Sequence, residues 1–293
     1  MANLKEIRTR INSVKTTRQI TSAMKMVSAA KLRKSQDAII QMRPYAHKLQ
    51  QILSDLAENV ESETVSAYQI QQPLKKILFI VITSNKGLCG SFNANIAKQA
   101  INEINTLYSE LWNEGAVDIL AIGKKGAEML TAKGYKPKEN KHHIFDNLTF
   151  EQTRIVSEEI VSKYLKGEYN LVKLFYNQFR NAATQDVTAE QYLPLPQIDQ
   201  PHWEKEHHDY ILEPGKEEII ASLIPKSLKV TFYKALIESF ASEQGARMTA
   251  MHKATDNASD LIRDLQLEYN KARQASITNE ILEIVGGAEA LKG

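Results

Sequence analysis

Apolar side chains near the start of the chain follow a spacing of three and four residues. The first members of this pattern are Leu4, Ile7, Ile11 and Val14. Such spacing is typical of an amphipathic helix or of one partner in a coiled coil. Beyond Val14 the strict heptad positions are polar, and the apolar residues drift to Ile20, Met24 and Val27. The pattern predicts a long helix over residues 3–57 whose seam differs from that of a simple zipper.

The end of the chain carries a more regular version of the same pattern. Apolar or small residues alternate at intervals of four and three at Met251, Thr255, Ala258, Ile262, Leu265, Tyr269 and Ala272. The register then shifts to Ile277, Ile281, Ile284 and Val285. These residues predict a second long helix over residues 226–285, with Gly286 and Gly287 as its C-terminal stop.

Both end segments are almost free of helix breakers, since all eight prolines lie between Pro44 and Pro225. At about 1.5 Å per residue the second helix would be roughly 90 Å long, whereas a compact chain of this length has a radius of gyration near ~19 Å. Both helices must therefore project. Because both join the middle of the chain by their inner ends, we expect them to pair as an antiparallel coiled coil.

The middle of the chain alternates between strand-like and helix-like patterns. Apolar runs predict strands at 76–83, 117–122 and 171–177, with a further edge strand near 186–193. Helical patterns lie between them at 92–112, 124–133 and 151–166. This βαβαβ order predicts an open, Rossmann-like α/β domain with mostly parallel strands. The expected organisation is an N-terminal coiled-coil helix (1–58), a central α/β domain (74–200) and a C-terminal coiled-coil helix (210–293).

The composition excludes several classes of protein. With 43% hydrophobic and 25% charged residues, the chain of 293 residues is neither wholly disordered nor collagen-like. No stretch approaches 18 uncharged apolar residues, so the sequence predicts no transmembrane helix. The single cysteine, Cys89, excludes an internal disulfide framework and most cysteine-based metal sites.

The net charge of +2 hides an uneven distribution. Residues 1–48 hold eleven basic and two acidic side chains, a balance of +9, whereas residues 49–225 balance at −7. A basic segment of this kind suits a mitochondrial transit peptide, nucleic-acid binding, an anionic membrane surface or the solvated face of a coiled coil. The helical pattern runs well past residue 30, which argues against the transit and membrane interpretations. The acidic body argues against nucleic acid.

Two glycine-containing loops follow predicted strands, at Asn85–Gly90 and Ile122–Gly126. Backbone N–H groups at the start of a helix can hold a phosphate. Neither loop has the spacing of a nucleotide P-loop or of a dinucleotide fingerprint. We interpret both as tight turns without a ligand, predict no catalytic residue and no cofactor, and interpret Cys89 as buried filler.

Histidines gather at two places, His142–His143 and a group made of His202, His207, His208 and Asp209. Imidazole groups are common zinc ligands, but these spacings match no zinc motif. The sequence therefore predicts no metal site.

Apolar residues also crowd the C-terminal end of the second helix, at Ile277, Ile281, Leu282, Ile284, Val285, Ala288 and Leu291. The end of a coiled coil that faces water should be polar. An apolar end implies a partner that covers it.

Three stretches of the sequence resemble the γ subunit family of rotary ATP synthases. They are residues 7–31 (IRTRINSVKTTRQITSAMKMVSAAK), 241–251 (ASEQGARMTAM) and 265–285 (LQLEYNKARQASITNEILEIV), and Gly87–Gly90 matches a mid-chain motif of the family. The resemblance covers the whole chain and is densest at both ends.

The resemblance implies a non-catalytic shaft, one per complex, that turns inside a hexamer of alternating α and β subunits. A ring of c subunits would drive it and so couple proton flow to ATP synthesis, or hydrolysis to pumping in reverse. The α/β domain would lie outside the hexamer, on the ε subunit and the c ring. The implied location is the cytoplasmic face of a bacterial inner membrane, with membrane association only through the complex and no nucleic-acid partner.

The resemblance also implies specific contacts. The residues implied to contact the β subunit are Met24, Lys25, Arg273, Gln274, Thr278 and Glu280. Those of an apolar bearing are Ile277, Ile281, Ile284 and Val285, and those of a foot facing the c ring and ε are Tyr210, Leu212 and Glu213. Many relatives carry Asp where this chain has Asn85, and the cysteine-containing redox insertion of chloroplast relatives is absent.

Two other functions stay open from the residues alone. One is an RNA-binding protein that uses the basic helix, which a salt-dependent RNA affinity would support. The other is a nucleotide-binding enzyme that uses the Gly87–Gly90 loop, which hydrolysis lost on changing Lys86 would support.

Overall fold

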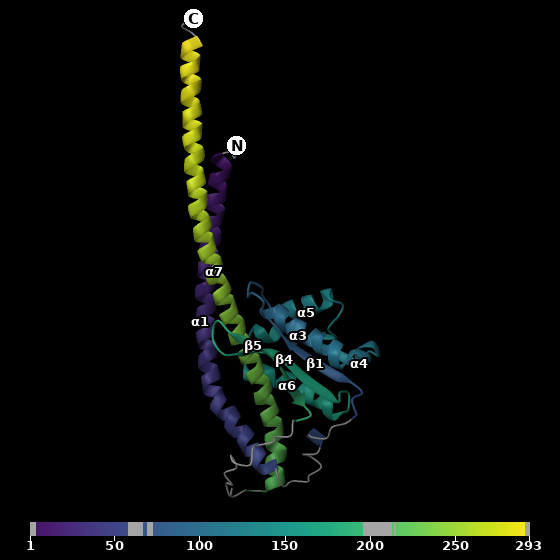
Figure 1. Cartoon of the computed structure of the whole chain (residues 1–293). Coiled ribbons are helices and arrows are strands. Elements are labelled where there is room, and N and C mark those ends of the chain that lie inside the picture. Colours follow the sequence, from purple (N-terminus) through teal and green to yellow (C-terminus); the bar gives the residue numbers. More distant parts are fainter. Residues whose placement is uncertain (1–3, 58–66, 69–72, 196–212, 214, 291–293) are drawn as a thin grey trace. The chain divides into compact units, whose positions relative to one another are not determined.

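The computed structural model describes residues 4–57, 67–68, 73–195, 213 and 215–290. Its elements, in chain order, are α1 (Leu4–Ala57), β1 (Ile77–Ile82), α3 (Phe92–Leu107), α4 (Ser109–Asn113), β2 (Val117–Ile122), α5 (Lys124–Ala132), β3 (Glu139–Asn140), the 3₁₀ helix η1 (His142–Phe145), α6 (Phe150–Leu165), β4 (Leu171–Phe179), β5 (Gln185–Leu193) and α7 (Lys216–Ala290) (Figure 1). The chain divides into two compact units, residues 1–28 with 248–293, and residues 29–247. Each unit has its own apolar core.

The larger unit is built on a five-stranded sheet with strand order β3-β2-β1-β4-β5. β1 is central and runs parallel to both of its neighbours, β2 and β4. β5 returns antiparallel to β4 and closes one edge as a hairpin. The predicted open α/β domain with mostly parallel strands and an edge hairpin is thus confirmed.

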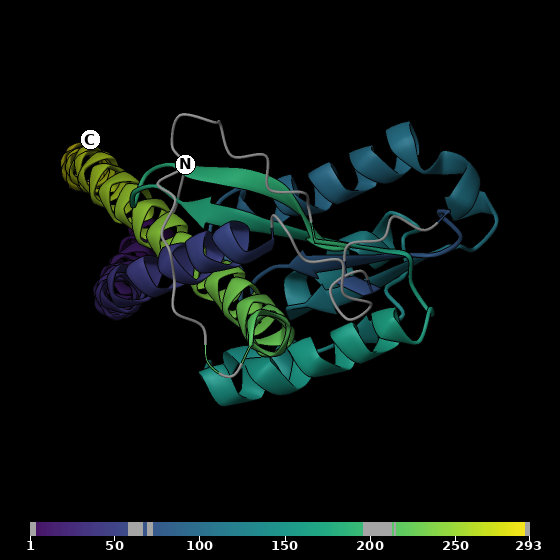
Figure 2. The same ribbon diagram turned by 90° about the horizontal axis from the view of Figure 1, so that it is seen from below.

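Helices cover both faces of this sheet, which explains why every residue of β1 is buried. Leu78, Ile80 and Ile82 face a core shared with α6 and the first part of α7. The alternate residues Ile77, Phe79 and Val81 face a second core shared with α3 and α5. Figure 2 shows α3 and α6 on opposite sides of the strands.

Helix α7 departs from the prediction at both ends. It begins at Lys216, ten residues before the predicted start, and runs through Pro225. Proline weakens a helix because it lacks an N–H group and crowds the preceding turn. Here the turns around it are anchored by Ile220, Ile224 and Leu228, all of which are buried in the core. This burial offsets the missing hydrogen bond.

The remaining departures are local. The predicted helix over 92–112 is interrupted at Tyr108 and forms α3 and α4. The two-residue strand β3 pairs with β2 at an edge of the sheet. The sequence did not predict it, because two residues carry no periodic pattern.

Candidate functional site

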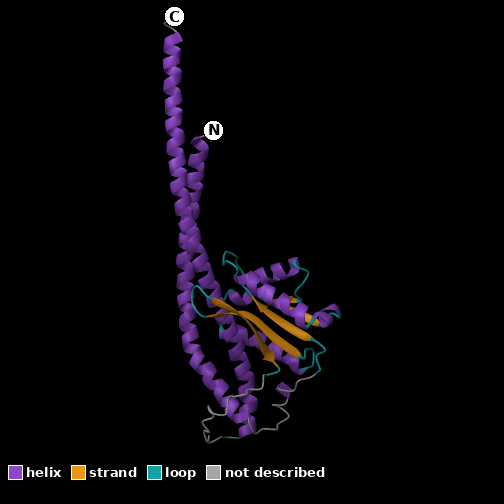
Figure 3. Cartoon of the chain, in the orientation of Figure 1, coloured by secondary structure: helices purple, strands orange, loops and turns teal. Residues whose placement is uncertain are grey.

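In the smaller unit, where Figure 3 draws both chain segments as helices, α1 and α7 pair with each other. Ile7 and Ile11 of α1 form an apolar cluster with Leu265 of α7. Farther along α1, the hydroxyl oxygens of Thr21 and Thr255 lie 2.9 Å apart. Residue numbers rise along one helix as they fall along the other, so the pair is antiparallel, as predicted. The predicted seam of α7 is also confirmed, with buried side chains at Met251, Ala258, Ile262 and Leu265.

The α1 side of this coiled coil keeps its heptad register with polar residues. Thr21 and Ser28 are buried at heptad positions, whereas Ile20 and Val27 are more than half exposed. Small hydroxyl side chains fit a helix seam because they bond to a carbonyl of their own helix, as Thr21 does to Arg18. Ile20 and Val27 of the apolar stripe noted in the sequence therefore point away from α7, whereas Met24 is half-buried.

Helix α7 continues past the first turn of α1 as a single helix (Figure 1). Its last side chains in the cluster with α1 are Tyr269 and Ala272. Every side chain described from Ile277 to Glu289 is exposed, and Ile284 exposes 71% of its surface. We call residues 277–289 the tip. Among the described residues, the tip has no packing partner.

The predicted stop at Gly286 and Gly287 is wrong, because α7 runs on to Ala290. Each glycine weakens a helix interior by about 1 kcal/mol relative to alanine but leaves its N–H and C=O groups free to bond. Glycine therefore ends a helix only where another conformation is favoured. A helix end without a packing partner offers no such alternative.

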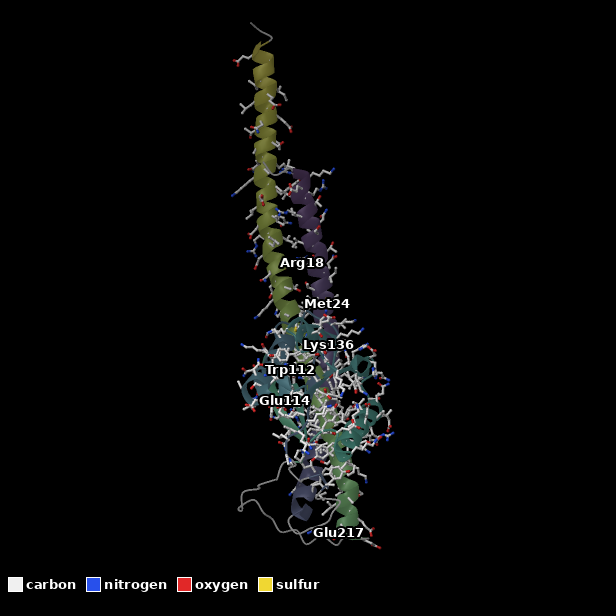
Figure 4. All side chains as sticks on the ribbon, turned by 90° about the vertical axis from the view of Figure 1, so that its right-hand side faces the viewer. Arg18, Met24, Trp112, Glu114, Lys136 and Glu217 are labelled. Carbon is white, nitrogen blue, oxygen red and sulfur yellow. The ribbon has the colours of Figure 1, made fainter. Side chains whose placement is uncertain are left out.

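The residues predicted to contact the β subunit lie in two separate groups. Met24 and Lys25 are half-buried on α1, where Figure 4 labels Met24 and the nearby Arg18. The second group is exposed on α7 and consists of Arg273, Gln274, Thr278 and Glu280. Since Thr21 lies opposite Thr255 in an antiparallel pair, Met24 is level with about residue 252 of α7. The second group, which begins at Arg273, therefore lies roughly 32 Å farther along the helix. The two groups therefore cannot form one cluster.

Within the second group the polar side chains bond along their own helix. The Thr278 hydroxyl donates to the Gln274 carbonyl at 2.9 Å, and the Ser276 hydroxyl donates to Glu280 at 3.3 Å. Such bonds pre-order the side chains on an exposed helical surface. Of the predicted foot residues, Glu213 is exposed, whereas Tyr210 and Leu212 lie outside the described residues.

The loop after β1 offers its carbonyl groups rather than its N–H groups to the neighbouring helix. Arg247 of α7 donates to the Lys86 carbonyl at 2.7 Å and to the Gly87 carbonyl at 3.2 Å. A phosphate would need converging N–H donors. The loop after β2 packs closely against Thr83, because a Cβ at Gly123 would lie 2.3 Å from the Thr83 carbonyl oxygen. The interpretation of both loops as tight turns is supported by these contacts.

Cys89 is buried, as predicted, and burial raises the pKa of its thiol. Among the described residues, no group of three His, Cys, Asp or Glu side chains is arranged to hold a metal ion. The histidine group at 202–208 lies outside the described residues. None of the helices in the described part of the chain is long and apolar enough to cross a membrane.

Sequence reasoning assigned no role to four charged residues that connect elements of the larger unit. Glu243 and Arg247 form a buried ion pair at 2.6 Å; burial raises the pKa of Glu243 while Arg247 opposes that rise. Glu238 is buried and accepts a bond from Arg43 of α1 at 3.4 Å. Burial raises the pKa of Glu238. The sequence does carry a signal for the pair of Glu243 and Arg247, because an acid and a base lie four residues apart within an apolar helical stretch.

Comparison with known proteins identifies the family. The sequence matches the ATP synthase family over residues 3–291. A protein of Flavobacterium johnsoniae named ATP synthase gamma chain is 56% identical over 293 residues, covering 100% of both chains. The chain belongs to the ATP synthase gamma chain family. It is a gamma subunit of an ATP synthase, as the resemblance implied.

Other members of the family agree over the full length. The gamma chain of Cytophaga hutchinsonii is 51% identical and matches 99% of each chain. Among solved structures, the chain is similar to one of the Tetrahymena thermophila mitochondrial ATP synthase central stalk and c-ring, with a TM-score of 0.58 and 28% identity over 80% of this chain and 99% of that one. A chain from the Euglena gracilis mitochondrial ATP synthase reaches a TM-score of 0.68 at 19% identity, covering 98% of this chain and 94% of its own. At that identity it supports the gamma subunit fold alone.

Proposed function

We propose that this gamma subunit is the rotor shaft that transmits rotation of a c-subunit ring to the catalytic β subunits of a proton-translocating ATP synthase. The observation that carries the proposal is the tip. Five large apolar side chains there are about half exposed or more: Ile277, Ile281, Leu282, Ile284 and Val285. An apolar surface of this kind on a soluble helix marks a protein-protein contact. A sheath formed by the α and β subunits would cover it.

The tip combines two kinds of surface that suit a shaft turning in a sleeve. Ile277, Ile281, Ile284 and Val285 would form the bearing, because apolar contacts are non-directional and change little as the helix turns. Arg273, Gln274, Thr278 and Glu280 would make directional polar contacts to a β subunit in some orientations only. Such differential contact is required if rotation is to change nucleotide affinity at the β subunits.

A second contact region lies on α1. Met24 and Lys25 would approach an acidic β segment, and the balance of +9 over residues 1–48 favours an acidic partner. At the other end, Tyr210, Leu212 and Glu213 would form the foot on the c ring and the ε subunit. In this arrangement the gamma subunit is non-catalytic, and it meets the cytoplasmic face of a bacterial inner membrane only through the complex.

Truncation of the tip tests the proposal. A chain ending after Asn279 loses the bearing residues Ile281, Ile284 and Val285, and we expect ATP-driven proton pumping by the assembled complex to be weakened. A chain ending after Gly287 keeps those residues and serves as the matched control. Pumping is measured in inverted membrane vesicles as quenching of a pH-sensitive dye. Full pumping by the shorter chain would contradict the proposal.

Co-purification tests the partners directly. A tagged chain expressed in its host should be recovered with α, β and ε subunits in one complex with ATPase activity. Recovery with RNA instead, in a form released by salt, would favour the RNA-binding alternative.

A further inference from the structure

A cavity of about 430 Å³ opens in the larger unit between α1, α6 and the first turns of α7. Figure 2 shows α6 beside this part of α7. Small-molecule sites in proteins are mostly clefts of ~300–1,000 Å³ with an apolar or aromatic lining and a few polar groups that converge on the ligand. The cavity has both features, and none of its lining residues belongs to the loops after β1 and β2.

The lining of this cavity combines rings and positive charges. The rings are those of Tyr45, Phe150 and Tyr233, and the charged groups are those of Arg154, Lys226 and Lys229. No carboxylate lines the cavity among the described residues. The six side chains come from three helices that are far apart in the sequence, so they meet only in the folded chain.

One neighbouring carboxylate positions two of the three cationic groups. Glu158 accepts a hydrogen bond from Arg154 at 2.9 Å and pairs with Lys229 at 2.7 Å. Arg154 also pairs with the exposed Glu151 at 3.1 Å. In the part of the chain that the structure describes, Lys226 forms no ion pair. Three cationic groups against two carboxylates leave a net charge of +1, which favours an anionic ligand.

The aromatic side of the cavity also has a group without a partner. Phe150 and Tyr233 pack edge to face, with their ring centroids 5.5 Å apart, and so hold each other in place. Tyr45 is 56% exposed and contacts no other ring among the described residues. A nucleobase stacks well on a side chain of this kind, because every base has a flat π-face.

The cleft continues along the same two helices beyond Lys229. A second cavity of about 370 Å³ shares Lys229 with the first and is also lined by Ser162 and Lys166 of α6. A ligand with a chain of anionic groups therefore finds room and a further cation on the far side of Lys229.

We infer that the cavity between α1, α6 and α7 binds a nucleotide, with its base against Tyr45 and its phosphate groups beside Lys226 and Lys229. A phosphate ester on a flat ring matches both the positive charge and the unpartnered ring. An inorganic anion leaves the rings unused, and an uncharged apolar ligand leaves Lys226 without a counter-ion. This site is additional to the proposed shaft function and does not depend on it.

Calorimetric titration of the purified full chain tests the inference, because nucleotide sites on other subunits are then absent. We expect one ADP to bind per chain. Pyrophosphate lacks the ring and adenosine lacks the charge, so each should bind roughly tenfold more weakly or worse. Equal affinity for ADP and either of these two would overturn a nucleotide site, as would a lack of saturable ADP binding at millimolar concentration.

Two substitutions at exposed positions test the location of the site without disturbing the core. Lys226→Glu reverses the unpaired charge and Tyr45→Ala removes the ring, and each should weaken ADP binding by roughly tenfold. Lys226→Arg should keep most of the affinity. Lys133→Ala, an exposed lysine of the same unit, is the matched control and should bind ADP like the original chain. Unchanged affinity in both Lys226→Glu and Tyr45→Ala would overturn the site.

Amide hydrogen exchange locates the ligand independently. ADP should slow exchange at residues 150–158 and 226–233 and leave residues 84–90, the loop after β1, unchanged. Lys86→Ala, at an exposed position in that loop, should bind ADP normally. Slower exchange confined to residues 84–90, together with loss of ADP binding in Lys86→Ala, would place the nucleotide at the glycine-containing loop and overturn the inference.

Discussion

Two stretches of α7 differ in which side chains they bury. They are residues 238–247 and residues 277–289. The first stretch buries Glu238, Ser242, Glu243 and Arg247, whereas the second exposes its isoleucines. Helical sequences usually place polar groups outside and apolar groups inside. In the first stretch each buried side-chain nitrogen or oxygen, except one carboxylate oxygen of Glu238 and the Ser239 hydroxyl, has a hydrogen-bond partner among the described residues. In the second, the apolar groups have no packing partner among the described residues, and under the proposed function the α and β subunits would cover them.

Burial alone does not distinguish a helix that stabilises its own chain from a helix that binds another chain. What distinguishes the two stretches is whether their unusual residues are satisfied within the chain. A buried charge that is paired internally contributes to the fold, while an exposed apolar residue contributes only after assembly. Substitutions in the first stretch should therefore change the stability of the chain, and substitutions in the second should change the stability of the complex.

The largest effect is expected for Glu243→Ala. It leaves the buried Arg247 guanidinium without its carboxylate, and breaking one side of a buried pair lowers the free energy of unfolding by about 3–5 kcal/mol. The measurement is urea denaturation of the purified chain. Replacing both partners, in Glu243→Leu with Arg247→Met, should be less damaging than Glu243→Ala. An equal loss in both variants would show that packing rather than uncompensated charge dominates here.

Two truncations of apolar side chains to alanine should affect the chain very differently. Leu236→Ala removes a fully buried side chain from the core of the larger unit and should lower the free energy of unfolding by about 2–5 kcal/mol. Ile284→Ala removes a side chain that is 71% exposed and should change it by no more than about 0.5 kcal/mol. Both are measured on the chain alone. A large loss from Ile284→Ala would mean that the tip packs within its own chain.

A further effect is expected at Glu238, and its size depends on pH. Burial raises the pKa of this carboxyl despite the nearby Lys234 and Arg43, and Glu190 raises it further. The folded chain therefore binds a proton more tightly than the unfolded chain, and this contribution to stability is present at low pH and lost as the pH rises through the folded pKa. The free energy of unfolding then falls with pH by at most about 1.4 kcal/mol per pH unit through this one group.

Glu238→Gln removes that slope, because glutamine does not titrate. Thermal unfolding of the variant and of the original chain between pH 4 and pH 8 should diverge in favour of the variant as the pH rises. Glu114→Gln, at an exposed position on the α/β domain, serves as the control. A constant difference across this range would show that the Glu238 carboxyl titrates alike in the folded and unfolded chain.

Much of the fold could be predicted because its signals are periodic. The strand at 117–122 is found with the predicted bounds, and the seam of α7 follows the predicted heptads. The predicted ends of the C-terminal helix were wrong at Pro225 and at Gly286–Gly287. Local propensity takes no account of burial around a proline, or of a helix end that has nothing to pack against. Tertiary context decided both cases.

The interaction surfaces were predictable to a different degree. The apolar tip could be recognised from composition, since so many isoleucines at a helix end contradict exposure to water. The contacts of Arg247 with Lys86 and Gly87 could not, because they join residues 161 and 160 positions apart. The specific contacts with β, ε and the c ring stay predictions, because they would be made between this chain and other chains.

The exposed tip has a consequence for how the cell handles this protein. A newly made chain presents Ile281, Ile284 and Val285 to water until the other subunits arrive. During that interval the helix end favours self-association and is open to chaperones and proteases. Under the proposed function, the supply of the subunits that cover the tip would therefore limit how much of the chain survives, and unassembled copies would be removed first.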